Sequence, residues 1–194
     1  MPAIFSERQK EILRQQLLDT GFDLLKKYGY RRMTIDILTK SCHIAKGTFY
    51  SFFKNKEDFL YEMMIYGREL ERNKLTEHLS PDKTLTRCGF KAYVYSMLEN
   101  DYNIFSFMSR EETTLLMAAW PPKYLLNVSN DENTSLWILN MIPDKSPDCD
   151  WKLFVNYMKG LAIITNYKEL LNADAAEASI ERFIDDMIRY VWKD

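Results

Sequence analysis

The chain has 194 residues, of which 46% are hydrophobic and 28% are charged. This balance is typical of a folded globular protein and excludes an intrinsically disordered one. Glycine and proline occur only six times each. Together with the abundance of Leu, Met, Lys and Glu, this scarcity favours an all-helical fold. The length allows one domain or two small ones.

Charge is distributed unevenly along the chain. Residues 1–56 hold 11 Lys/Arg and 5 Asp/Glu, so that, of the totals of 26 and 28, residues 57–194 hold 15 and 23. A basic segment on an acidic remainder is expected when only the first part faces phosphate. Ordinary surface charge would produce the same asymmetry, so charge alone does not establish nucleic-acid binding.

Cysteine, histidine and hydropathy patterns exclude several other classes. Cys42, Cys88 and Cys149 show no CxxC spacing, so neither a disulfide framework nor a metal site is predicted, and a reducing cytoplasm is expected. The chain turns polar after five residues, which argues against a signal peptide, and no apolar run approaches the ~20 residues of a membrane span. His43 and His78 lack metal-ligand partners at helical spacing. With no nucleophile motif or phosphate loop either, we expect neither an enzyme nor a cofactor.

The first predicted helix begins after the N-cap Ser6 and ends at Gly29, a residue that often terminates helices. Its apolar positions recur every three or four residues. These positions are Leu13, Leu17, Gly21, Leu24 and Tyr28.

Two short helices and one long helix follow. Thr34 is a capping residue for a helix at 35–41, and a tight turn then leads into a helix at 45–53. Asn55 caps a long helix that continues to about Leu79. Two short helices joined by about three residues form a helix-turn-helix, whose second helix is small enough to enter the major groove of DNA.

The pattern remains helical after Pro81. Predicted helices lie at 85–98, 105–120, 136–142, 151–171 and around 180–191. The helix at 151–171 has apolar residues on two adjoining faces, so it must be buried on two sides.

The second short helix carries groups suited to DNA at its N-terminal end. Lys46, Thr48 and Tyr50 supply a cation, a hydroxyl and a phenol. Gly47 is less favourable in a helix than alanine by roughly 1 kcal/mol, and we interpret it as allowing close approach of the helix backbone to DNA. The aromatic residues that accompany them are expected to pack inward. These are Phe49, Phe52 and Phe53.

Three segments make the signal more specific: Thr34-Ile35-Asp36, Lys46-Gly47-Thr48-Phe49-Tyr50 and Phe53-Lys54-Asn55-Lys56-Glu57-Asp58-Phe59-Leu60. In this order they resemble the N-terminal signature of the TetR family of transcriptional regulators, over about residues 8–62. The resemblance implies an all-α fold of about nine helices. It also implies a DNA-binding domain at 1–56 and a ligand-binding and dimerisation domain at 57–194.

The resemblance implies DNA contacts at seven positions: Thr34, Lys46, Gly47, Thr48, Tyr50, Lys54 and Lys56. Thr34 would hold a phosphate at the start of its helix, where the backbone amides favour an anion. Lys46 and Thr48 would meet base edges, with Lys46 the expected guanine reader. Tyr50 and Lys56 would bind phosphates, and Lys54 is a weaker candidate for the same role.

Three residues depart from the family pattern. His43 stands where glycine is usual in the turn, so the turn is expected to differ or to be strained. Ala45 stands where a capping serine is common and provides no hydroxyl. Phe52 stands where tyrosine or histidine is frequent and cannot donate a hydrogen bond. These departures leave the exact set of DNA contacts open.

The resemblance further implies a homodimer built from the last two long helices. The predicted interface residues are Phe154, Met158, Leu161, Phe183, Met187 and Val191. Alternatively, the helix at 151–171 is simply central in a monomer. An effector pocket is implied in the middle region, where Met and aromatic side chains suit apolar or aromatic molecules. Its predicted residues are Tyr93, Met97, Phe105, Met108, Met117, Trp120 and Trp137, which at helical spacing are also typical of an ordinary core. Glu111 and Glu112 are candidates to face a cationic ligand, but adjacent carboxylates on a helix are usually solvated.

The sequence therefore predicts a cytoplasmic, sequence-specific regulator of transcription. The expected partners are a palindromic double-stranded operator, a second copy of the chain and a small-molecule effector that releases the repressor from DNA; no membrane partner is expected. The alternative is a helical interaction protein without operator-specific DNA binding.

Overall fold

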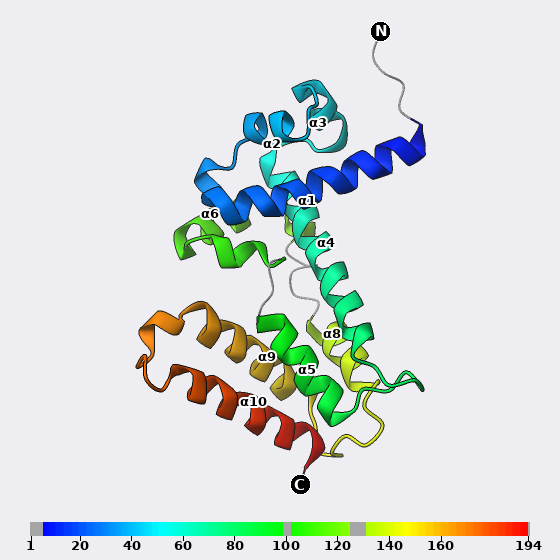
Figure 1. Cartoon of the computed structure of the whole chain (residues 1–194), viewed down its shortest axis with the longest axis vertical. Coiled ribbons are helices and arrows are strands. Elements are labelled where there is room, and N and C mark those ends of the chain that lie inside the picture. The colour runs from blue at the N-terminus through cyan, green and yellow to red at the C-terminus, as the bar shows by residue number, and fades with distance from the viewer. Residues whose placement is uncertain (1–5, 99–101, 125–130, 194) are drawn as a thin grey trace. The chain divides into compact units, whose positions relative to one another are not determined.

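The protein is all-helical, as its composition predicts. The computed structural model describes residues 6–98, 102–124 and 131–193, and every regular element in these ranges is a helix (Figure 1). The α-helices are α1 (Glu7–Arg32), α2 (Ile35–Ser41), α3 (Lys46–Phe52), α4 (Lys56–Glu77), α5 (Arg87–Leu98), α6 (Arg110–Ala119), α8 (Asp131–Leu139), α9 (Trp151–Asn166) and α10 (Ala176–Trp192). Two short 3-10 helices are η1 (Ile104–Phe107) and η2 (Lys168–Leu170). No helix in the described ranges is long and apolar enough to cross a membrane.

The chain forms two compact units. The first comprises residues 1–70 and 101–125, and the second comprises residues 71–100 and 126–194. The first unit therefore contains α1–α3, most of α4, η1 and α6, whereas the second contains the end of α4 with α5 and α8–α10. The expected division of function at residue 56 stays a prediction, because compactness alone assigns no function to either part.

The first unit is built on the apolar face of α1. The helix begins with a capping box, in which the Ser6 and Gln9 side chains each accept a hydrogen bond from the other residue's backbone N–H. Gly21 allows α4 to approach α1 closely, since a Cβ at this position would lie only 2.6 Å from the ring of Phe59. The buried side chains of α1 are Leu13, Leu17, Leu18, Phe22, Leu24 and Leu25. This pair of helices forms the base against which the helix-turn-helix packs.

The second unit has its own hydrophobic core. Figure 1 shows α9 and α10 side by side and running in opposite directions, and α5 packs against α10. The rings of Phe90 on α5 and Phe154 on α9 have centroids 6.0 Å apart. The amphipathic helix α10 contributes one buried stripe to this core: Ile180, Ile184, Met187 and Val191.

Several helix boundaries differ from those predicted, among them the end of α9, which lies at Asn166 and not at residue 171. The first helix resumes for one turn after a kink at Gly29, whose φ of 72° and ψ of 171° are not helical. The predicted helix at 105–120 is divided, because Ser109 starts α6 with a capping box to Glu112. Helix α8 begins at Asp131, within a segment predicted to be a break. The other end of that segment lies outside the described residues.

Candidate nucleic-acid interface

Helix α2 is capped by Thr34, as predicted. Thr34 has extended backbone angles, and its Oγ1 accepts a hydrogen bond from the backbone N–H of Ile37 at 3.3 Å. The residue is exposed, so its hydroxyl hydrogen can still be donated to a phosphate at this helix start.

The turn between α2 and α3 keeps a left-handed residue despite lacking glycine. His43 has a φ of 55° and donates its backbone N–H to the carbonyl of Lys40 at 3.2 Å. The backbone N–H of Ile44 then bonds the carbonyl of Thr39 at 3.0 Å. The expected strain is therefore localised at His43, because left-handed angles cost an L-residue with a Cβ about 1–2 kcal/mol. Ala45 is the N-cap of α3 and makes no side-chain capping bond, as its side chain predicts.

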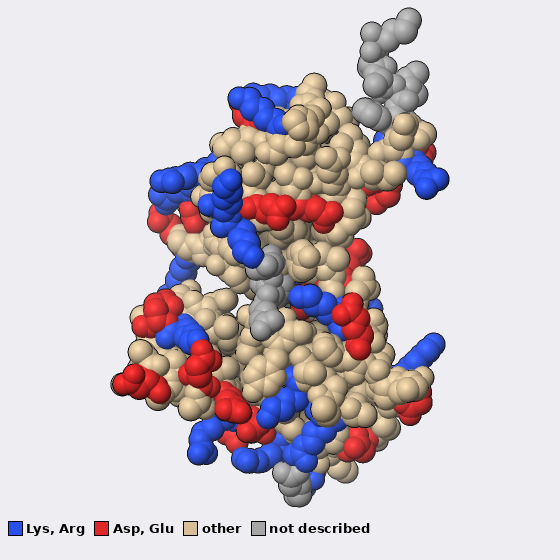
Figure 2. Space-filling view, in the orientation of Figure 1, with Lys and Arg blue, Asp and Glu red and all other residues tan. Residues whose placement is uncertain are grey.

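The first turn of α3 is open to solvent. The side chain of Lys46 is 57% exposed, and Tyr50 is 52% exposed. A Cβ built on Gly47 would meet no atom within 4 Å. The surface around α2 and α3 also carries further exposed basic residues, and blue side chains lie over this part of Figure 2. These residues are Arg31, Arg32, Lys40 and Lys54.

Lys46 is paired with an acidic residue of α2. Its Nζ lies 2.6 Å from Oδ1 of Asp36, whose side chain is 56% exposed. This hydrogen bond raises the pKa of the Lys46 ammonium, so the lysine stays charged at neutral pH. Thr48 is less exposed than either residue, and its carbonyl accepts a hydrogen bond from the Ser51 hydroxyl at 2.6 Å.

The opposite side of α3 is anchored by aromatic packing. Phe49, Phe53 and Phe59 are at most 1% exposed. Their ring centroids lie between 4.9 and 5.5 Å apart, within the range of favourable aromatic contacts. Phe52 is only partly buried. Because the inner side is packed, the orientation of the outer side with Lys46 and Tyr50 is set by the core.

The two lysines near the start of α4 have different surroundings. Lys54 is exposed, and its backbone N–H donates to Oδ2 of Asp58 at 3.0 Å. The Nζ of Lys56, by contrast, donates to the carbonyl of Tyr30 at 2.5 Å and lies 4.0 Å from the centre of the Tyr30 ring. Burial lowers the pKa of Lys56. A phosphate contact by Lys56 therefore requires its ammonium to leave Tyr30 or to bridge the two groups.

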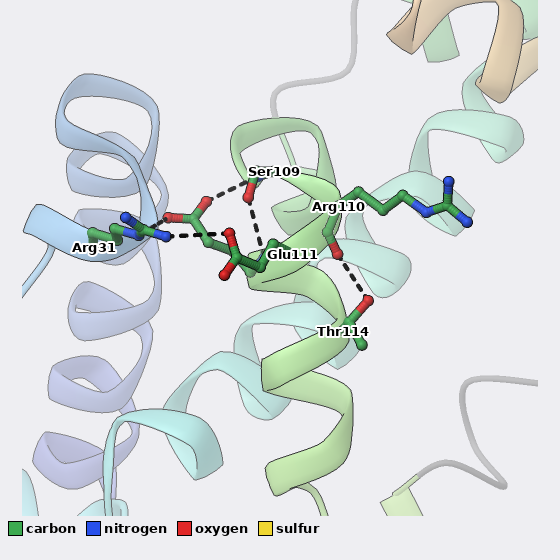
Figure 3. A network of polar contacts seen from close by, with 6 residues as sticks. Arg31, Ser109, Arg110, Glu111 and Thr114 are labelled. Atoms are coloured by element: carbon green, nitrogen blue, oxygen red, sulfur yellow. Dashed lines mark hydrogen bonds and ion pairs between the residues drawn. The ribbon is translucent and has the colours of Figure 1, made fainter.

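A polar network joins the end of α1 to the start of α6 within the same unit (Figure 3). Arg31 lies 3.1 Å from Glu112 and 3.6 Å from Glu111. Glu112 also accepts the backbone N–H of Ser109 at 2.8 Å. The two carboxylates considered for a cationic ligand thus pair with an arginine. In the sequence, the pattern Ser109-x-x-Glu112 is typical of a capping box and indicates the start of α6.

Two aromatic residues after α6 bind the first turn of α4. Trp120 is 4% exposed and donates its Nε1–H to the carbonyl of Glu57 at 2.9 Å. The hydroxyl of Tyr124 donates to Oδ1 of Asp58 at 2.5 Å, and its ring stacks on Tyr61 with centroids 3.6 Å apart. These contacts hold the helix that follows the helix-turn-helix, and no local sequence pattern predicted them.

The residues predicted for an effector pocket are divided between the two units. Phe105, Met108, Met117 and Trp120 belong to the first unit, and Tyr93, Met97 and Trp137 belong to the second. In the second unit Tyr93 is buried, and the other two pack against the same core. The pocket therefore stays a prediction.

The predicted dimer residues mostly contribute to the core of the second unit. Phe154, Leu161, Met187 and Val191 are buried there, and Met158 and Phe183 are partly buried against the same core. Large apolar residues that remain exposed on α9 and just beyond it are Leu153, Ile163, Tyr167 and Leu170. An interface on α9 would use these residues.

Metal binding finds no support in the described part of the chain. No group of three or more His, Cys, Asp or Glu side chains there could hold a metal ion.

Comparison with known proteins supports the interpretation of α2 and α3 as a DNA-binding helix-turn-helix. Residues 17–63 match the family described as "Bacterial regulatory proteins, tetR family". This stretch includes the whole of α2 and α3, and it confirms the resemblance expected at residues 8–62. The fatty acid metabolism regulator protein of Bacillus subtilis is 28% identical over 101 residues, which cover 50% of this chain and 51% of that protein. The transcriptional repressor NemR of Escherichia coli is 32% identical over 85 residues, which cover 44% of this chain and 43% of that protein.

These matches span about a third to a half of the relatives' own length. A solved structure is similar over a longer range: the regulatory protein TetR from Rhodobacter sphaeroides superposes with a TM-score of 0.65 and 16% identity, over 93% of this chain and 99% of that one. The likeness confirms the predicted fold. The relatives are named as regulators, in agreement with the prediction that the chain is not an enzyme.

Proposed function

We propose that the chain is a sequence-specific DNA-binding regulator of transcription, because its residues 17–63 match the family described as "Bacterial regulatory proteins, tetR family". In full, the proposal is a homodimeric repressor that binds a palindromic operator and releases it when a small molecule binds the C-terminal domain.

The open first turn of α3 is the observation that carries the proposal. A helix with Lys46 and Tyr50 exposed, and with space over Gly47, can enter the major groove without its own side chains keeping the backbone away from the bases. Lys46 would donate to guanine, and Tyr50 would donate to a phosphate. Thr34 and Lys54 would bind phosphates at the edges of this surface, with Thr48 and Lys56 as further contacts.

Selection of bound sequences from a random DNA pool, repeated at several salt concentrations, tests this proposal. We expect a palindromic motif and an affinity that falls steeply with salt, since phosphate binding releases counterions. Lys46→Ala should relax the base preference. Lys193→Ala is a matched control, because Lys193 is 66% exposed and is likewise paired with an aspartate, Asp148.

The outcome distinguishes the main alternative. If the wild-type protein binds all DNA weakly and selects no motif, the chain is a helical interaction protein and the proposal is wrong. If Lys46→Ala and Lys193→Ala have the same selected motif as the wild type, the protein is a regulator but Lys46 does not read bases.

We assign dimerisation to the exposed apolar residues of α9 and η2. Two half-sites about one helical turn apart require two recognition helices, and a homodimer supplies them. Ile163 is 60% exposed on α9, and Ile163→Glu should produce monomers in sedimentation. Ile12→Glu is the matched control, because Ile12 is also 60% exposed but lies on α1. A dimer that resists Ile163→Glu would exclude this surface.

Effector release is the remaining part of the proposal. The continuous helix α4 contributes residues to both compact units. A ligand bound in the C-terminal domain would shift α4 and thereby the spacing of the two recognition helices. A panel of apolar and aromatic compounds should contain one that raises the melting temperature of the protein and releases the selected DNA. The panel includes palmitate because one relative is named a fatty acid metabolism regulator protein. Stabilisation without release would contradict the coupling.

A further inference from the structure

Asp36 stands out chemically on the DNA-facing surface. It is the only Asp or Glu between residues 33 and 56, a stretch that contains four lysines. It lies in the first turn of α2, and its side chain is 56% exposed. A carboxylate at a phosphate-binding surface is repelled by the DNA backbone, so its presence there requires a reason.

Helix capping does not require this residue. The side chain of Thr34 already caps α2 by accepting the N–H of Ile37. The Asp36 carboxylate instead lies 2.6 Å from Nζ of Lys46, on the first turn of the recognition helix α3. Next to this pair is the open surface of Gly47. The ion pair is therefore presented where α3 can approach DNA most closely.

The donor and acceptor order of this pair matches one base pair. In the major groove, a G·C pair presents the O6 and N7 acceptors of guanine beside the N4 amino donor of cytosine. Lysine donates to the former, and a carboxylate accepts from the latter. Because the Asp36 carboxylate and the Lys46 ammonium already lie within hydrogen-bonding distance of each other, they can contact these neighbouring base edges at the same time.

We propose that Asp36 is a base-specificity residue that reads one G·C base pair per half-site together with Lys46, accepting a hydrogen bond from the N4 amino group of cytosine while Lys46 donates to guanine. The proposal rests on the proposed function. It adds that Asp36 lowers affinity for DNA lacking this base pair, because its carboxylate then has no donor on the bases and is still repelled by the nearby phosphates.

The test uses the full-length protein and the DNA motif selected by the wild type. A duplex in which the cytosine is replaced by 2-pyrimidinone lacks the N4 amine. It therefore loses the donor that Asp36 would use together with one Watson–Crick hydrogen bond to guanine, and the second effect is the same for the wild type and for Asp36→Ala. We expect the wild type to bind this duplex roughly 5- to 150-fold more weakly than the parent duplex. Asp36→Ala should bind the two duplexes equally well, and its affinity for unrelated DNA should rise.

Three variants complete the design. Lys46→Ala should retain the sensitivity to the missing amine. Asp131→Asn, which removes the partner of Lys159 in the second unit, controls for the loss of one negative charge. Thermal unfolding of Asp36→Ala confirms that the exposed substitution leaves the fold intact.

Two results would overturn the proposal. In the first, Asp36→Ala remains as sensitive to the missing amine as the wild type. In the second, Asp36→Ala becomes insensitive both to the missing amine and to replacement of the guanine by 7-deazaguanine, which lacks the N7 acceptor, and Asp36 would then be a positioning residue for Lys46. A wild-type protein that selects no motif at all would instead refute the proposed function itself.

Discussion

Replacing Gly47 by alanine should separate the stability of the free protein from its affinity for DNA. A Cβ at this position meets no atom within 4 Å, so the added methyl group causes no clash in the free protein. Glycine in a helix is less favourable than alanine by about 1 kcal/mol, and less at a helix end. We therefore expect Gly47→Ala to raise the free energy of unfolding by up to about 1 kcal/mol.

The same methyl group would point from α3 toward the bases in the proposed complex. Keeping the helix backbone away from the groove weakens every contact of the first turn, and we expect affinity for the selected DNA to fall by about tenfold, equivalent to about 1.4 kcal/mol. Urea unfolding followed by tryptophan fluorescence gives the stability, and fluorescence anisotropy of labelled DNA gives the affinity.

Gly29→Ala is the matched control for the stability measurement. A Cβ at Gly29 also meets nothing within 4 Å, but the backbone there has a φ of 72° and a ψ of 171°. Only glycine adopts these angles readily, so this variant should lose about 1–3 kcal/mol of stability. Unchanged DNA affinity in Gly47→Ala would show that the first turn of α3 does not approach DNA. A loss of stability in that variant would show that the space over Gly47 is occupied.

Three further substitutions are expected to change the free energy of unfolding measured by urea. Ala45→Ser adds the capping hydroxyl that α3 lacks and should stabilise the protein by about 1 kcal/mol; no gain would mean that the new hydroxyl does not reach the N–H groups of α3. His43→Gly removes the strain of a left-handed φ of 55°. Glycine is also more flexible in the unfolded chain, which offsets part of this gain, so the free energy of unfolding should rise by a net amount of about 0.5–1 kcal/mol. Lys83→Gly, at a φ of 63° in the second unit, should behave in the same way. Neither carboxylate oxygen of Glu71 has a hydrogen-bond partner among the described residues, and burial raises its pKa above the ordinary 4.5 although Lys74 lies 3.6 Å away. The folded state therefore binds the Glu71 proton more tightly than the unfolded state does. The protonated carboxyl stabilises the folded state fully below pH 4.5, and this contribution to the free energy of unfolding is lost as the pH rises through the raised pKa. Glu71→Gln should be more stable than the wild type at neutral pH by about 1–3 kcal/mol, and the difference should shrink at about pH 4; a difference independent of pH would contradict the assignment to this carboxylate.

Much of the helix-turn-helix and its helix boundaries could be predicted from the sequence because their determinants are local. Ser6, Thr34 and Asn55 cap helices through hydrogen bonds that reach only three residues along the chain. The absence of a side chain at Gly47 and of a hydroxyl at Ala45 can be read directly from the residue type. Spacing of apolar residues then predicted which side of α3 is packed, since helical periodicity determines what shares a face.

Contacts between distant residues could not be predicted in this way. The pairing of Lys56 with Tyr30 and the bond from Trp120 to Glu57 join positions 26 and 63 residues apart. Asp36 and Lys46 lie on different helices, so their contact depends on the turn that joins these helices.

The sequence by itself determined the all-helical fold and the helix-turn-helix, through composition, periodicity and local capping. Only the tertiary structure decided which apolar residues of α9 and α10 fill the core of the second unit and which stay exposed. Phe154 and Ile163 are both large and apolar on α9, yet one is 1% exposed and the other 60%. The physical reason is that the burial of a residue depends on which helices pack against its face of the helix. When a helix has apolar residues on two faces, its sequence alone does not specify which of the two faces the neighbouring helices will cover.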